Sequence, residues 1–220
     1  MAHIHLPDGT FSMPWVLIWS VFSVFLIGFL VKKYQRSGDS DVGKLSTASI
    51  LTALTFAVFQ IELPLFGGVH MDLTPLLGIL LGPVLGCSSV LIVNIFSAAL
   101  GHGGWSMLGA NFLINSTEVL VSYYLFNAFT KLIRSRFVQT GISSILALIV
   151  GNFVMVGMVA VSGIQGTTLT PLQIAQDLLP LSIVNIALAF VEGVVTAFAV
   201  TYIARVKPEL LSKTNQAGGI

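Results

Sequence analysis

The sequence has 220 residues, of which 55% are hydrophobic and only 9% charged, and its mean hydropathy is +0.93. A soluble domain carries roughly a quarter of its residues as charged side chains, so this composition excludes a soluble globular protein. The net charge of +1 gives no basic surface for nucleic acid. A single cysteine, Cys87, excludes an internal disulfide framework and any CxxC motif. The apolar runs along the chain then predict an all-α polytopic membrane protein.

These apolar runs follow one another from residue 14 onward, and a helix of about 20 residues is enough to cross a bilayer. The third and fourth runs are short and lie in a glycine-rich stretch that contains Pro83. In order, the runs cover residues 14–31, 45–65, 73–82, 84–100, 106–130, 141–162 and 174–204. We therefore expect a single membrane domain over residues 1–220. It consists of an extracytoplasmic segment (1–13), about seven transmembrane helices (14–206) and a cytoplasmic tail (207–220).

Orientation follows from the basic residues, because Lys and Arg in short loops stay on the cytoplasmic side. With these crossings and an extracytoplasmic amino terminus, all ten Lys and Arg residues lie on the cytoplasmic side. The four histidines, His3, His5, His70 and His102, then lie on the outer side. No Lys or Arg precedes Lys32, so the basic region of a cleavable signal peptide is missing. We expect the first residues to stay on the mature protein.

The amino-terminal sequence Met-Ala-His-Ile-His places a histidine close to a free amine. A terminal amine, a deprotonated amide nitrogen and His Nδ1 form fused chelate rings, and such in-plane nitrogen donors suit Ni(II), Cu(II) or low-spin Co(II). If Met1 is removed, Ala2 supplies the amine and His3 two nitrogens, and His70 is the candidate for the fourth donor. If Met1 is retained, its amine, the amides of Ala2 and His3 and the His3 imidazole fill the plane. A plain polar tail is the alternative to a metal site.

Two glycine-rich loops on the predicted outer side carry the other histidines. The glycines at 67–68 would let the loop with His70 fold back into the outer mouth of the bundle; a plain connector with a solvated histidine is the alternative. His102 lies in a similar loop before the fifth run. Asn111 and Asn115 are four residues apart and share a helix face. There they hold a histidine ligand in place or bond to a neighbouring helix.

Two carboxyl groups, Glu118 and Glu192, lie near the middle of apolar runs. Ionisable residues at such depth are functional or paired. Because no Lys or Arg lies at their depth, we expect them to be protonated or to bond to Asn or Ser. No HExxH, Ser/His/Asp or GxxxxGK[ST] pattern occurs in the sequence, so neither a hydrolase site nor an ATPase site is expected on this chain.

Small residues recur every four positions in two of the runs. The two sets are Gly78, Gly82, Gly86 and Ser49, Ala53, Ala57. Such faces let helices approach closely within a bilayer. For the glycines we expect packing inside the chain.

Several motifs can be read together: His-Ile-His-Leu-Pro-Asp-Gly near the amino terminus, Gly-Gly-Val-His, Gly-His-Gly-Gly-Trp-Ser-Met-Leu-Gly-Ala-Asn, and Val-Glu-Gly at Glu192. With them the chain resembles, over essentially its whole length, the CbiM/NikM family. This family is the substrate-binding membrane component of energy-coupling-factor transporters for cobalt and nickel. The resemblance implies a six-helix core with an extra amino-terminal helix and a location in the plasma membrane. It implies Co(II) or Ni(II) as the transported substrate, with no permanently bound cofactor.

The resemblance also implies partners and no enzyme activity of the chain's own. ATP would be hydrolysed by two cytoplasmic ATPase subunits, linked through a transmembrane coupling subunit, and a small accessory membrane subunit is a further partner. The family docks on the coupling subunit through an Ala-xxx-Ala face. Ala53 and Ala57 match that spacing.

By resemblance, His3 takes the role of the amino-terminal ligand and His70 that of a ligand from a later loop. The sequence departs from the family, because it begins Met-Ala-His where members typically begin Met-His-Ile. Removal of Met1 would restore the family geometry. The additional His5 is either the aligned ligand or an axial or supporting group, and of these we favour the second. His102 stands where the family usually has Asp.

Two other functions stay open at this stage. A substrate-binding component for an organic vitamin would need an aromatic-lined pocket. An intramembrane metalloenzyme would need an open coordination position and a general base near the metal.

Overall fold

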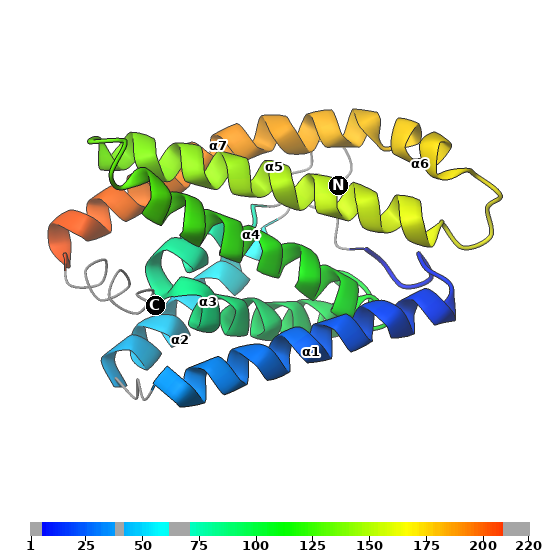
Figure 1. Cartoon of the computed structure of the whole chain (residues 1–220), viewed down its shortest axis with the longest axis horizontal. Helices are drawn as coiled ribbons and strands as arrows, with labels where there is room; N and C mark the ends of the chain where they lie inside the picture. Colours follow the sequence, from blue (N-terminus) through cyan, green and yellow to red (C-terminus); the bar gives the residue numbers. More distant parts are fainter. Residues whose placement is uncertain (1–5, 38–41, 62–70, 209–220) are drawn as a thin grey trace.

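The computed structural model describes residues 6–37, 42–61 and 71–208, and over these parts the chain is all-helical, with no strand. The predicted fold class is therefore confirmed, and Figure 1 shows the helices packed lengthwise as an elongated bundle. The helices are α1 (Met13–Ser37), α2 (Val42–Phe59), α3 (Thr74–Ala99), α4 (Leu108–Phe129), α5 (Arg136–Ser162), α6 (Pro171–Asp177) and α7 (Leu179–Val206).

Four of the described helices have the length and hydropathy expected of membrane spans. By these two measures α1, α3, α5 and α7 can each cross a bilayer, and α2 is a shorter apolar helix. The outer face of α1 is covered with exposed large apolar side chains such as Val24, Phe25 and Phe29. Such a face suits contact with lipid rather than water. Because α1 is also largely exposed along its length, it lies at the edge of the bundle, as expected for an extra amino-terminal helix.

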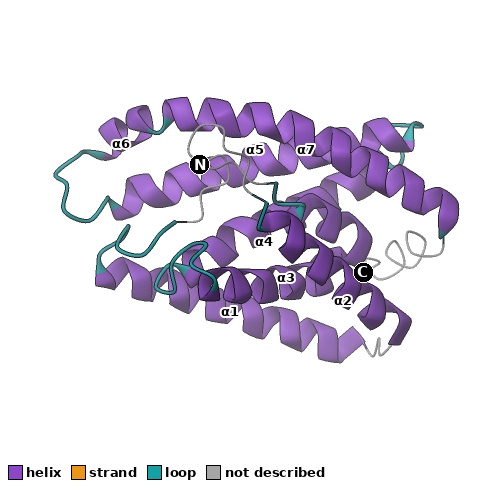
Figure 2. Ribbon diagram, turned by 180° about the vertical axis from the view of Figure 1, so that it is seen from behind, coloured by secondary structure: helices purple, strands orange, loops and turns teal. Residues whose placement is uncertain are grey.

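The two ends of the bundle differ in composition. Where α1 and α7 end, α2 begins and α4 turns into α5, at the left of Figure 1, lie nine of the ten Lys and Arg residues; the tenth, Lys213, is outside the described residues. We call this the basic end. At the opposite end, three loops gather: residues 6–12, 100–107 and 163–170 (Figure 2). We call this the loop end, and its described loops contain no Lys or Arg.

Helix α3 is bent sharply at Gly82, whose φ of 75° and ψ of −177° are not helical. The following Pro83 has no N–H to donate and so favours the break. The division predicted between residues 73–82 and 84–100 is therefore confirmed, as two arms of one bent helix. In the first arm, a Cβ at Gly78 would collide with the carbonyl of Val119 on α4. The absence of a side chain lets the two backbones touch.

The second arm of α3 runs back along the first, and the contacts of the first arm show where along the bundle it begins. A Cβ at Gly86 would lie 3.2 Å from the carbonyl oxygen of Leu77, so the two arms pack back to back. Thr74, the first residue of the first arm, contacts Glu118, halfway along α4. The first arm thus begins in the middle of the bundle and runs toward the basic end. This arm is shorter than a full crossing, so the two separate passages predicted here are corrected to one bent helix. Gly78 and Gly86 serve packing inside the chain, as predicted.

Two predicted boundaries need correction. The run expected over 174–204 is divided at Leu178, which ends α6 and precedes α7. Pro180 lacks the N–H that would continue the hydrogen-bond ladder to Gln176, and the apolar residues on both sides hide this break in the sequence. Helix α2 ends at Phe59 and not at residue 65.

Close contacts fix α1 against the loop end of the bundle. The Ser23 hydroxyl donates to the carbonyl of Gly109 on α4 at 2.7 Å, and the Trp19 indole donates to the Ser162 hydroxyl on α5 at 2.8 Å. Gly109 leaves no room for a side chain, because its Cβ would lie 2.8 Å from the Cα of Ser20. The position of α1 is important below, because the amino-terminal segment leads directly into it.

Candidate metal-binding end of the bundle

The amino-terminal segment is packed into the loop end rather than lying on its surface. Leu6 and Phe11 are only 3% and 2% exposed and belong to an apolar cluster with Met107, Met155 and Ile174. Burying two large apolar side chains stabilises this position by about 1.5–3 kcal/mol each. The segment that directly follows His5 therefore has a defined place in the fold.

Asn111 holds the backbone of this segment. The Leu6 N–H donates to Asn111 Oδ1 at 2.9 Å, and Asn111 Nδ2 donates to the Leu6 carbonyl at 3.2 Å. The Gly104 N–H also donates to that carbonyl, at 3.2 Å. The Asn111 amide thus pairs with both polar groups of one residue, as a neighbouring strand would.

Asp8 ties the same segment to the loop before α4. Its carboxylate accepts hydrogen bonds from the Ser106 hydroxyl at 2.5 Å and from the Ser106 N–H at 2.8 Å. These bonds, the hydroxyl bond first, lower the pKa of Asp8 below its usual value, so the group is ionised at neutral pH. A side chain at Gly104 would collide with Asp8. On the other flank, the Gln165 N–H donates to the Thr10 carbonyl at 2.9 Å.

The two asparagines of the predicted pair have different partners. Asn111 contacts the amino-terminal segment, whereas Asn115 Nδ2 donates to Asn94 Oδ1 at 3.1 Å and so joins α4 to the second arm of α3. Asn115 thus makes a bond to a neighbouring helix, which is one of the two contacts that the sequence left open.

His102 lies at the edge of the loop end, partly exposed. Its backbone N–H donates to the Ser97 carbonyl at 2.8 Å, and its ring meets the ring of Phe59 edge-on, with 6.0 Å between the centroids. Phe59 is the last residue of α2. His102 therefore lies beside the end of α2.

The predicted metal ligands themselves lie outside the described residues: they are Met1, Ala2, His3, His5 and His70. Within the described parts of the chain, no group of three or more His, Cys, Asp or Glu residues is arranged to hold a metal ion. The structure accordingly places the two segments that follow the predicted ligands, beginning at Leu6 and Met71, and not the ligands.

The two carboxyl groups predicted inside the membrane are both fully buried. Glu118 Oε2 accepts a hydrogen bond from the Thr74 hydroxyl at 2.5 Å. The Glu192 carboxyl lies close enough to Asp72 for the two groups to influence each other electrostatically. Asp72 and Thr74 were missed from the sequence, because a short polar stretch before an apolar run is typical of an ordinary helix start.

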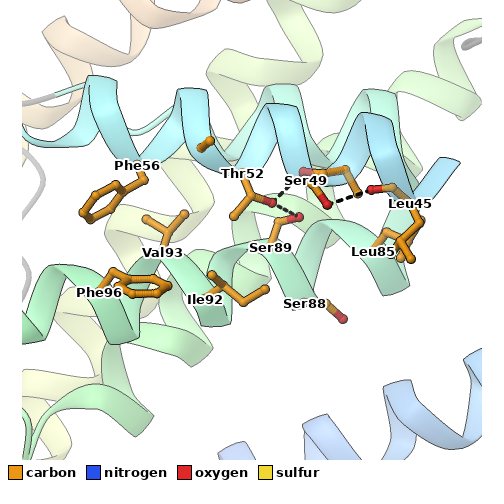
Figure 3. Close-up of a pocket in the computed structure, with 12 residues that line it drawn as sticks. Leu45, Ser49, Thr52, Phe56, Leu85, Ser88, Ser89, Ile92, Val93 and Phe96 are labelled. Carbon is orange, nitrogen blue, oxygen red and sulfur yellow. Dashed lines mark hydrogen bonds between the residues drawn. The ribbon is translucent and has the colours of Figure 1, made fainter. Parts of the chain in front are cut away.

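An open groove follows α2 and the second arm of α3, with a volume of about 430 Å³. Figure 3 shows Phe56 and Phe96 at one end of the groove and Leu45 and Leu85 at the other, with the Thr52 hydroxyl donating to Ser89 Oγ at 2.7 Å between them. Both predicted docking residues, Ala53 and Ala57, are exposed on α2, and Ala53 lines this groove. The face is accessible to a partner helix.

Comparison with known proteins defines the class of this membrane protein. The family model described as "Cobalt uptake substrate-specific transmembrane region" matches residues 5–210. The chain belongs to this family, CbiM. Its predicted membership is thereby confirmed, together with a part in cobalt or nickel transport.

Relatives and solved structures agree with this membership. The chain is 27% identical to "Putative cobalt transport protein CbiM 1" of Methanocorpusculum labreanum, over 98% of this chain and 95% of that protein. It is 28% identical to "Putative fused nickel transport protein NikMN" of Archaeoglobus fulgidus, over 98% of this chain and 70% of that protein. A crystal structure of a transition metal transporter has the same fold, with a TM-score of 0.80 at 18% identity over 98% of this chain and 100% of that one. These relatives are named as transport proteins, in agreement with a non-enzymatic role.

Proposed function

We propose that this chain is the substrate-capture subunit of an ATP-driven cobalt or nickel uptake transporter of the energy-coupling-factor type. The ion is chelated by the amino terminus, through the amine, a backbone amide and the His3 imidazole. His70 completes the nitrogen set when Ala2 carries the amine. His5 is two residues from His3 in the sequence, and His102 lies in the loop end. In the proposal both support the ligands and do not bind the ion.

The observation that carries this proposal is the pairing of Asn111 with both backbone groups of Leu6. A terminal chelate of this kind needs a fixed chain direction immediately after its ligands, because a free tail loses conformational entropy whenever it binds. The Asn111 amide, together with the Asp8–Ser106 bonds, supplies that direction. No such support is needed for a plain polar tail.

The donor set accounts for selectivity. Nitrogen ligands suit Ni(II) and Co(II), whereas Mg(II) and Ca(II) need oxygen donors. Because the amine, the amide and the imidazoles must lose protons before they bind, metal affinity falls as pH is lowered.

The remaining assignments concern the membrane and the partners. In the proposal the basic end faces the cytoplasm, in accord with the positive-inside rule, so that the loop end and the amino terminus lie outside the plasma membrane. The coupling subunit docks on α2 at Ala53 and Ala57, and transmits ATP hydrolysis from two cytoplasmic ATPase subunits. A small accessory membrane subunit completes the complex.

The test is titration of the purified chain with Ni(II) and Co(II), with the amino terminus intact, acetylated or extended by one residue. Intact mass establishes whether Met1 is present. Blocking should abolish tight binding, and His70→Ala should weaken it if Ala2 is the first residue. Unchanged affinity after acetylation would refute the amine chelate.

A further inference from the structure

A small polar cavity lies inside the bundle, where α4, α5 and α7 come together. Helix α5 packs between α4 and α7 (Figure 1). The cavity has a volume of about 10 Å³, and its polar wall consists of Asn115 and Glu118 from α4, Asn152 from α5 and Asn185 from α7. A volume of this size, about one water-sized sphere, is the smallest that admits a water molecule. The cavity therefore has room for one molecule as small as water.

Asn152 and Asn185 form a hydrogen bond between α5 and α7 that leaves part of each amide unmatched. Asn185 Nδ2 donates to Asn152 Oδ1 at 2.8 Å. Each residue is 6% exposed, and among the described residues neither Asn152 Nδ2 nor Asn185 Oδ1 has a hydrogen-bond partner. The pair thus brings one unmatched donor and one unmatched acceptor to the cavity wall. Turning both amides over would exchange these two roles and keep one of each.

The Glu118 carboxyl is held beside this pair of amides. Glu118 is fully buried, and its Oε2 accepts from the Thr74 hydroxyl at 2.5 Å. A side chain at Gly151 would collide with the same carboxyl, so the carboxyl lies directly against the backbone of α5, next to Asn152. Because each carboxyl oxygen has two lone pairs, Glu118 adds acceptor capacity to the wall alongside its bond to Thr74.

A water molecule matches this set of groups. Buried amide groups are nearly always hydrogen-bonded, to protein or to ordered water, and burying them without partners is costly. The oxygen of a water would accept from Asn152 Nδ2, and one of its protons would be donated to Asn185 Oδ1. The Glu118 carboxyl offers an acceptor for the second proton, which gives the three bonds typical of a buried water. A bare metal ion does not match, because the positive end of an N–H group would face it.

We propose that this cavity binds a single water molecule, which bridges Asn152 on α5 and Asn185 on α7 and links both to Glu118 on α4. The site is separate from the proposed metal ligands and goes beyond the capture role. The water joins three helices in the middle of the membrane domain. A bare cobalt or nickel ion is not retained there.

X-ray radiolytic footprinting tests the site, because a bound water irradiated in place gives hydroxyl radicals that oxidise adjacent side chains. Methionine sulfur takes up one oxygen atom in this reaction and becomes the sulfoxide. Met155 lines the cavity and is 3% exposed, whereas Met158 on the same helix is 6% exposed and does not line it. In the purified full-length chain, Met155 should be oxidised several-fold faster than Met158, although it is the less exposed of the two.

An external oxidant and two variants show whether the oxidation of Met155 depends on the site. Hydrogen peroxide added to the solution reaches side chains from outside, so it should oxidise Met158 at least as fast as Met155. Asn152→Leu and Asn185→Leu each replace an amide with an apolar side chain of similar size. Both should lower the radiolytic oxidation of Met155 to the level of Met158. If thermal unfolding shows that neither variant folds, the two methionines of the unchanged chain carry the test.

A matched control separates loss of the water from general destabilisation. Gln139, also on α5, is buried near the basic end, where its Nε2 donates to the Phe126 carbonyl at 2.6 Å and to Thr130 Oγ1 at 2.8 Å. Gln139→Leu removes these bonds at a distance from the cavity. It should lower the melting temperature and leave the radiolytic oxidation of Met155 unchanged.

Two results would overturn the water site. The first is radiolytic oxidation of Met155 that is no faster than that of Met158, or that persists in both leucine variants. The second concerns a bound cation in place of water. The melting temperature should be the same in equal concentrations of sodium, potassium and choline chloride, and a stabilisation by sodium that is lost in Asn185→Leu would show that the cavity binds the cation. Neither result bears on the capture of Ni(II), because Ni(II) affinity is not measured.

Discussion

Replacing Asn111 with leucine removes the amide that holds the amino-terminal segment while keeping a side chain of similar size. The Leu6 N–H then loses its acceptor, Asn111 Oδ1. The Leu6 carbonyl keeps its bond from the Gly104 N–H. The perturbation is therefore confined to one backbone donor and one of two bonds to one acceptor, in a residue that is 3% exposed.

The expected loss of Ni(II) affinity follows from the hydrogen bonds that Asn111→Leu removes. A buried donor left without an acceptor costs about 1–3 kcal/mol. In the variant, the amino-terminal segment avoids this cost by leaving its place on α4. Ion binding requires the segment to return, so part of the binding free energy is spent on the unpaired donor. The apparent affinity for Ni(II) then falls by roughly 5- to 150-fold.

The assay compares Asn111→Leu with Asn115→Leu by calorimetric titration with Ni(II) and by thermal unfolding. Asn115 is a matched control, because it lies four residues along the same helix and donates to Asn94 on α3. Both variants should unfold at lower temperature, and only Asn111→Leu should lose affinity. Unchanged affinity in Asn111→Leu, or an equal loss in Asn115→Leu, would show that the reasoning is wrong.

Three further predictions concern the segment, the helix contacts and the groove. Asp8→Asn should lower the melting temperature at pH 7, because the lowered pKa makes the ionised carboxylate stabilising above its ordinary pKa of 3.8; the difference from the unchanged chain should vanish as pH falls below that value. A difference that persisted in acid would contradict the assigned role of the charge. Gly78→Ala should destabilise by about 1–3 kcal/mol through overpacking against Val119, whereas Gly157→Ala, which meets nothing within 4 Å, should not; equal effects in thermal unfolding would contradict the close packing. Ala53→Trp should reduce co-purification of the coupling subunit and metal uptake while leaving Ni(II) affinity unchanged, and normal uptake would exclude this face as the docking site.

The helices themselves could be predicted from the sequence, because a helix that crosses a membrane needs a run of about 20 apolar residues. The division of α3 was also predictable, since Gly82 and Pro83 stand together in an apolar run. The position along the bundle at which its first arm begins could not be predicted. Composition gives the length of an apolar segment but not the level at which it starts, and that level depends on the contact between Thr74 and Glu118 across two helices.

The candidate site shows the same limit in its polar contacts. Asn111 and Asn115 share a helix face and are indistinguishable by spacing, yet one pairs with Leu6 and the other with Asn94. Which neighbour lies opposite an amide is decided by the packing of segments far apart in the chain. For the same reason the break at Leu178 was missed, because Pro180 acts there through backbone geometry and not through polarity.

The contrast between the basic end and the loop end also governs how an ion approaches. Because electrostatic fields decay over about 8 Å at physiological ionic strength, and a helix such as α5 is about 40 Å long, an approaching cation responds only to the nearer end. There the described chain offers the ionised carboxylate of Asp8 and no ammonium or guanidinium group. In the proposed function, a divalent ion therefore meets an attractive field at the loop end and a repulsive field at the basic end, and its rate of capture should fall as salt is added.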